Sequence, residues 1–125
     1  EKARTVIEEL ISRVFATRNA AHIAHWKATG KGSFARHMAL GAFYDALPGK
    51  IDNIVECYQG AFGIIGKVKA AKEPGDDILA HLAEEAQWIN TNRDKIADGI
   101  HALENLLDDL AEEYFRTFYK LENLS

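Results

Sequence analysis

The sequence predicts an all-α protein, a bundle of four helices with a long connection between the second and the third. The chain of 125 residues has only two prolines and is rich in alanine, leucine, glutamate and lysine, which favours helices. Apolar residues also recur at spacings of three, four and seven in four separate stretches. The length favours one domain, residues 1–125, with one core.

Composition and charge argue against several classes of protein. The net charge of −4 argues against binding nucleic acid over the whole surface, which needs clustered lysine and arginine, so DNA binding is doubtful. No apolar run approaches the roughly 18 residues that span a membrane, so no membrane partner is expected. Residues 1–4 lack the pattern of a signal peptide, and Cys57, the only cysteine, cannot form an intrachain disulfide. We therefore expect a cytoplasmic protein.

The first helix is predicted over about residues 3–28. Its apolar stripe leads to a histidine near the end of the helix and comprises Ile7, Ile11, Val14, Ala21 and His25. The segment 29–32 contains two glycines, which adopt the left-handed conformation at a helix C-terminus at little cost. Ser33 is the predicted N-cap of the next helix.

The second helix is predicted to start near Phe34 and to end at residues 59–63. Pro48 removes a backbone hydrogen bond inside it and clashes with the preceding turn, so a kink or a restart is expected there. Residues 60–75 contain four glycines and Pro74, which indicates a connection that crosses the length of the fold. Three apolar side chains predict that this connection packs against the helices: Ile64, Ile65 and Val68.

The third and fourth helices are predicted over about residues 76–97 and 100–121. Asp76 or Asp77 should begin the third helix, and Asp98-Gly99 forms a short break before the fourth. The first and third connections are short and the middle one is long. That order of connections is the topology of the ferritin-like four-helix bundle, whereas a simple up-down-up-down bundle has three short connections.

Two histidines and two carboxylates stand at a spacing that predicts a metal site: His25, His37, Asp52 and Glu56. Imidazole and carboxylate ligands together suit iron, with manganese and zinc as alternatives, and open coordination positions suit redox iron. Asp52 and Glu56 are four residues apart, so they lie on one helix face about 6 Å from each other and can reach one cation. Each histidine taken alone is more often a core residue, and the joint spacing favours ligation.

The helix geometry predicts that this site is shared between two copies of the chain. His25 and His37 lie about one turn before and after the glycine turn, so they sit at similar depth on adjacent helices. Asp52 follows His37 by fifteen residues, which is about 22 Å along a helix. Unless Pro48 folds the helix back, one chain cannot bring the two halves together. Two antiparallel copies about a two-fold axis can, giving two sites per dimer.

The chain resembles the Dps group, the DNA-binding proteins from starved cells or mini-ferritins. The residues that carry this resemblance are His25-Trp26, Gly30, Phe34, His37, Leu40, Asp52 and Glu56. The resemblance is close over residues 25–63 and covers the other helices only in pattern. It implies a ferroxidase centre at a dimer interface, with the histidines from one subunit and the carboxylates from its partner. Trp26 would be an aromatic neighbour of the ligands.

The resemblance also implies an activity and an assembly. Fe(II) would be oxidised by peroxide or oxygen, and the product would be stored or detoxified. The protein would be a homo-oligomer, a two-fold dimer at least, with a dodecamer as the larger form. The runs 43–45 and 58–60 are also similar to small ferritin-like proteins encoded by phages.

Several features depart from the Dps pattern, among them a short crossover that is expected to lack the family's small middle helix. Gly41 stands where the family usually has an acidic ligand, so we expect one strong iron position and a second that is weak or absent. Asp45, one turn further on, lies beside the site without replacing that ligand. Pro48 falls where the family helix is continuous. A non-catalytic helical oligomer is therefore the alternative, and DNA coating would need a basic tail that this sequence does not show.

The alternative for Asp52 and Glu56 is a solvated helix face, on which they pair with Lys50 or with another base. Glu56 lies between Val55 and Cys57, which predicts partial burial, and a buried carboxylate needs a partner. The remaining histidines are assigned to surface or structural positions: His22, His81 and His101.

Overall fold

The computed structural model describes the backbone of residues 2–72 and 74–125, and the side chains from residue 6 onward within these ranges. The described chain forms four α-helices and no strand: α1 (Lys2–Lys27), α2 (Ser33–Phe62), α3 (Ile78–Ala97) and α4 (His101–Asn123). The predicted all-α class with four helices is confirmed, and the predicted ends agree within a few residues. Within the described ranges, no helix combines the length and the apolar character needed to cross a membrane.

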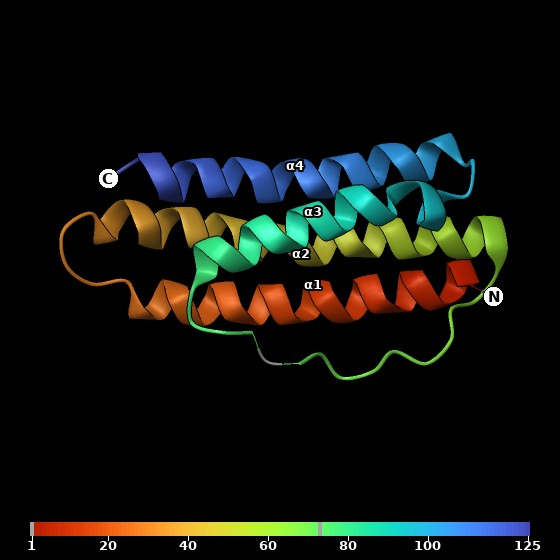
Figure 1. The fold of residues 1–125 in the computed structure, drawn as a ribbon, viewed down its shortest axis with the longest axis horizontal. Coiled ribbons are helices and arrows are strands. Elements are labelled where there is room, and N and C mark those ends of the chain that lie inside the picture. Colours follow the sequence, from red (N-terminus) through yellow and green to blue (C-terminus); the bar gives the residue numbers. More distant parts are fainter. Residues whose placement is uncertain (1, 73) are drawn as a thin grey trace.

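The four helices pack as a four-sided bundle. Helix α1 packs against α2 and α3, and α4 packs against the same two helices from the opposite corner. Figure 1 shows that α1 and α2 run in opposite directions, whereas α2 and α3 run in the same direction. The core draws on every helix, and its largest fully buried side chains are Tyr58, Tyr114, Phe43, Ile7, Leu10, Leu40, Leu47, Ile54, Leu82, Ile96, Leu103 and Leu107.

The connection between α2 and α3 passes alongside α1 and joins opposite ends of the bundle (Figure 1). The Glu8 carboxylate on α1 accepts a hydrogen bond from the backbone N–H of Gly66, which ties the connection to the bundle. Ile65 and Val68 are partly buried against the core, as predicted. Ile64 is exposed, so its predicted packing is wrong, because adjacent residues of an extended segment face opposite sides. The described parts of the connection, residues 63–72 and 74–77, contain no helix.

The cap of α3 agrees with the prediction, whereas the cap of α2 differs from it. Gly32, with φ 79°, is the N-cap of α2, and Ser33 is the first residue of the helix. The predicted Ser33 cap is therefore wrong, because the left-handed glycine completes the turn with backbone hydrogen bonds alone. At α3 the Asp77 side chain caps the helix by accepting a hydrogen bond from the Ala80 N–H over 3.1 Å, as expected for one of the two aspartates.

Helix α2 continues through Pro48 to Phe62, so it does not restart there, and the alternative of a kink stays a prediction. Pro48 lies on the exposed side of α2, while Leu47 and Ile51 on either side of it are buried in the core. Burial of these two side chains holds both halves of α2 against the bundle and offsets the lost backbone hydrogen bond. As a result, His37 and Asp52 stand on one helix, about 22 Å apart along its axis.

Candidate metal centre

His25 and His37 form a reciprocal pair at the end of the α1–α2 hairpin. Their imidazole rings stack with centroids 3.6 Å apart and planes 22° apart. The His25 Nδ1 lies 2.7 Å from the His37 carbonyl oxygen, and the His37 Nδ1 lies 3.0 Å from the His25 carbonyl oxygen. A carbonyl oxygen only accepts, so each Nδ1 carries the hydrogen and donates it. In the neutral rings, both Nε2 atoms therefore keep a free lone pair.

The glycine turn produces this pair. Gly30 has φ 90° and Gly32 has φ 79°, and together they reverse the chain over residues 28–32. The last turn of α1 then faces the first turns of α2, which brings the two histidines side by side. The prediction that they sit at similar depth on adjacent helices is confirmed. Their role as metal ligands stays a prediction.

The rings of His22 and Tyr44, neither of which was predicted to belong to the site, lie beside the pair. His22 stacks on Tyr44 with centroids 4.1 Å apart, and Tyr44 meets the His25 ring edge-on at 5.3 Å. Burial lowers the pKa of His22, and its neighbours Arg18 and His25 lower it further. The signal in the sequence was the position of His22 one turn before Trp26, since residues four apart share a helix face.

Asp52 and Glu56 lie one turn apart on α2, and both are exposed. The predicted partial burial of Glu56 is wrong, because the core-facing residues in this turn are Ile54 and Tyr58. The alternative pairing with Lys50 is not formed, since the Lys50 ammonium lies 2.7 Å from Asp109. No ion pair joins Asp52 or Glu56 to another described residue.

One chain thus brings together the two histidines and leaves the two carboxylates apart from them. The described part of the chain contains no group of three or more His, Cys, Asp or Glu side chains that could hold a metal ion. Trp26 and Asp45, predicted neighbours of the site, are both exposed, and the Trp26 ring contacts His22 with centroids 4.2 Å apart. The proximity of these two residues to a metal stays a prediction.

A second polar cluster, which no spacing in the sequence indicates, lies between α1 and α3 and joins the buried Glu85 to side chains that reach the surface. Arg13 lies 2.8 Å from the buried Glu85 and 3.0 Å from Glu9, and its guanidinium covers the Trp88 ring at 4.5 Å. Burial raises the pKa of Glu85, an effect that the Arg13 charge partly offsets. Arg13 and Glu85 also line a cavity of about 560 Å³ between α1, α3 and the connection before α3.

A buried hydrogen-bond chain lies next to this cluster. His81 Nε2 lies 2.8 Å from the Thr17 hydroxyl, and Tyr114 also hydrogen-bonds to Thr17. Burial lowers the pKa of His81 and raises that of the Tyr114 phenol. His81 therefore has a structural role in the bundle, as the sequence analysis assigned it.

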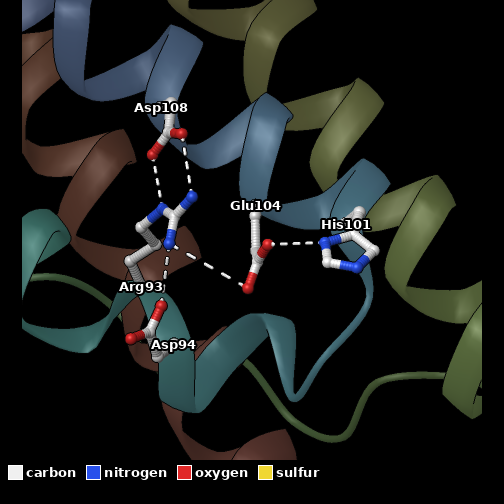
Figure 2. A network of polar contacts seen from close by, with 5 residues as sticks. All are labelled: Arg93, Asp94, His101, Glu104 and Asp108. Carbon is white, nitrogen blue, oxygen red and sulfur yellow. Dashed lines mark hydrogen bonds and ion pairs between the residues drawn. The ribbon is translucent and has the colours of Figure 1, made fainter.

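A third cluster joins α3 to α4 at the surface (Figure 2). Arg93 forms a two-pronged contact with Asp108, at 2.5 Å from Nε and 3.0 Å from Nη2, and its Nη1 lies 2.8 Å from Asp94. Glu104 lies between Arg93 and His101, and its carboxylate is 3.1 Å from the imidazole. These contacts connect the two helices next to their shared turn.

Residues 25–121 match a protein family described as a family of unknown function (DUF5856). The chain belongs to this family. The matched range begins at His25 and includes the glycine turn, both histidines and both carboxylates. No curated protein and no solved structure matches the chain.

Proposed function

We propose that this protein of the DUF5856 family binds and oxidises Fe(II) at sites shared between two copies of the chain, and that it stores or detoxifies the iron. The observation that carries the proposal is the reciprocal His25–His37 pair. Both rings are held in place, and in both the Nε2 lone pair is left free for an ion.

The hydrogen bonds of the pair fit a metal site. A ligating histidine nearly always donates its other ring N–H to a carbonyl or carboxylate, which fixes the tautomer and the ring orientation. His25 and His37 each donate Nδ1–H to a backbone carbonyl, which is a rigid acceptor. Two imidazole nitrogens are too few to hold Fe(II) alone, so further ligands have to come from elsewhere.

A second copy of the chain can supply these ligands. Asp52 and Glu56 are exposed, four residues apart and without an ion pair to any other described residue, and α2 is one helix from His37 to both carboxylates. If two α2 helices pack antiparallel about a two-fold axis, the histidines of one copy meet the carboxylates of the other twice. The carboxylates would supply negative charge for the cation.

Apolar side chains beside the histidines support such an interface. Trp26, Phe34 and Met38 are exposed by 66%, 75% and 56% at the same end of the bundle. Gathered exposed apolar side chains mark interaction surfaces more often than scattered ones do. The order of the connections further supports a ferritin-like bundle, because residues 63–77 join opposite ends of parallel helices (Figure 1).

The residues have distinct parts in the proposed reaction. His25 and His37 bind Fe(II) through Nε2, and Asp52 and Glu56 of the partner chain complete the site. Each Fe(II) gives one electron to peroxide or oxygen and becomes Fe(III). The negative carboxylates stabilise Fe(III) more than Fe(II), because Fe(III) carries the higher positive charge.

The test is oxidation of Fe(II) by the protein, followed optically with peroxide and with oxygen. Replacing His37→Ala and Asp52→Ala together should abolish the protein-dependent oxidation. His101→Ala and Asn53→Ala, which change an exposed histidine and a neighbour of Asp52, are the matched controls and should retain it. Unchanged oxidation in the double variant would refute the site.

A non-catalytic oligomer is the second candidate function. The observation that favours it is also the histidine pair, because two reciprocal hydrogen bonds give these rings a structural role in the α1–α2 hairpin without an ion. Crystals soaked with Fe(II) or Zn²⁺ distinguish the two candidates. Metal density at the Nε2 atoms supports the iron protein, and its absence supports the oligomer.

A further inference from the structure

Gly41 is the point at which the α2 backbone passes closest to the His25 ring. A Cβ atom built at this glycine would lie 3.2 Å from His25 Cε1 and 3.3 Å from His25 Nδ1. Contacts this short are tighter than nine in ten real Cβ contacts, so the ring would have to move by a few tenths of an ångström. The space of the missing side chain is therefore occupied by the imidazole.

The ring has little freedom to move away. His25 Nδ1 is bonded to the His37 carbonyl over 2.7 Å, and the His37 imidazole stacks on the His25 ring with centroids 3.6 Å apart. Tyr44 meets the same ring edge-on at 5.3 Å. A shift that relieves a Cβ atom at position 41 would disturb the Nδ1 hydrogen bond, the stack or the contact with Tyr44.

We infer that Gly41 is a positioning residue that seats the His25 imidazole with its Nε2 available to an ion. This inference rests on the proposed metal site and explains why position 41 is a glycine. If Gly41 only lacked a ligand, an acidic residue there would add one and raise the number of ions bound. If Gly41 is a spacer, any side chain there displaces the imidazole and weakens binding. The site then depends on imidazole nitrogen, a ligand that suits Zn²⁺ as well as Fe(II).

Three variants separate the two interpretations: Gly41→Ala, Gly41→Glu and Gly49→Ala. Gly49 is the matched control, because it lies in the same helix and an added Cβ there meets nothing within 4 Å. The probe is Co²⁺, titrated by its absorption spectrum into each full-length protein. Histidine ¹⁵N NMR without metal reports which ring nitrogen of His25 and His37 carries the hydrogen.

The expected results are specific to each variant. Gly41→Ala and Gly41→Glu should each weaken Co²⁺ binding by about tenfold or more, the usual effect of disturbing a residue that orients a ligand. The NMR signature of an Nδ1–H tautomer at His25 should weaken in both. Gly49→Ala should keep the wild-type affinity and spectrum. Tighter binding or an additional Co²⁺ in Gly41→Glu, or wild-type NMR spectra in both Gly41 variants, would overturn the inference.

A double-variant cycle tests the inference even if the single variant Gly41→Ala does not fold. In a His25→Ala background the crowded ring is gone, so adding Gly41→Ala should raise the melting temperature, as alanine does in a helix interior. A lower melting temperature in that background would overturn the inference. The NMR and melting measurements need no metal, so they test the role of Gly41 even if the wild-type protein binds no Co²⁺. Absence of Co²⁺ binding in the wild type would refute the proposed function and not the packing of Gly41 against His25.

Discussion

His25 and His37 connect the two helices of the α1–α2 hairpin. Each ring donates its Nδ1–H to the backbone carbonyl of the other residue, and the two rings stack with centroids 3.6 Å apart. The bond from the His37 ring gives a donor to the His25 carbonyl, which lies in the last turn of α1, where carbonyl groups lack an intrahelical partner. The two reciprocal bonds also fix both tautomers. The same two bonds that connect the helices also hold the rings as the proposed metal site requires.

The cap of α3 depends on one aspartate. Replacing Asp77→Ala removes the side-chain acceptor for the Ala80 N–H and should lower the free energy of unfolding by about 1 kcal/mol. Asp76→Ala, one residue earlier and outside the cap position, should cost clearly less. Urea unfolding of both variants measures the difference. Equal losses would show that Asp77 is not the cap.

The buried carboxylate of Glu85 depends on Arg13. Arg13→Ala leaves Glu85 buried without its cation and should lower the free energy of unfolding by about 2–3 kcal/mol, given that Arg13 is partly exposed. Arg116→Ala, which breaks an exposed pair with Glu112, should leave stability nearly unchanged. Denaturant unfolding compares the two variants, and a similar effect in both would contradict the assignment.

Sequence periodicity was sufficient for the helices, because each helix must bury one stripe of side chains. It failed where the outcome depended on other elements. Burial of Leu47 and Ile51 kept α2 intact through Pro48, and backbone hydrogen bonds around Gly32 made a serine cap unnecessary. For the site, the α1–α2 hairpin places the two histidines together locally, so their adjacency could be predicted.

The buried polar contacts could not be predicted from the sequence. His81 meets Thr17 across 64 positions of the chain, and Arg13 meets Glu85 across 72. No local spacing encodes such distances, since they follow from the way α3 packs on α1. The proposed carboxylate half of the metal site depends in the same way on contacts with a second chain.

Stability should decrease in mild acid because of His81. The ordinary histidine pKa is 6.5, and burial lowers it in the folded protein. Above pH 6.5 both states are neutral; below it the unfolded state takes up the proton first, so stability falls until the folded pKa is reached. His81→Gln should therefore lose less stability than the wild type between about pH 7.5 and pH 5.5. His101→Gln is the control, and an unaltered pH dependence in His81→Gln would contradict this role.

The surface network of Figure 2 depends on the shape of the arginine side chain. Arg93→Ala removes the two-pronged contact with Asp108 and should lower the melting temperature. Arg93→Lys should restore little of it, since an ammonium cannot match the carboxylate with two parallel bonds. The difference between wild type and Arg93→Ala should shrink at high salt. Full recovery with lysine would show that charge alone matters.

The central claim is that each chain carries half of an iron site, and mixing two inactive variants tests it most directly. His37→Ala and Asp52→Ala are co-expressed in equal amounts, and Fe(II) oxidation is compared with that of each variant alone. Random pairing makes half of the dimers mixed, and each mixed dimer holds one site with both wild-type halves. The account predicts recovery of about a quarter of the wild-type oxidation. A mixture as inactive as the separate variants would contradict a shared site.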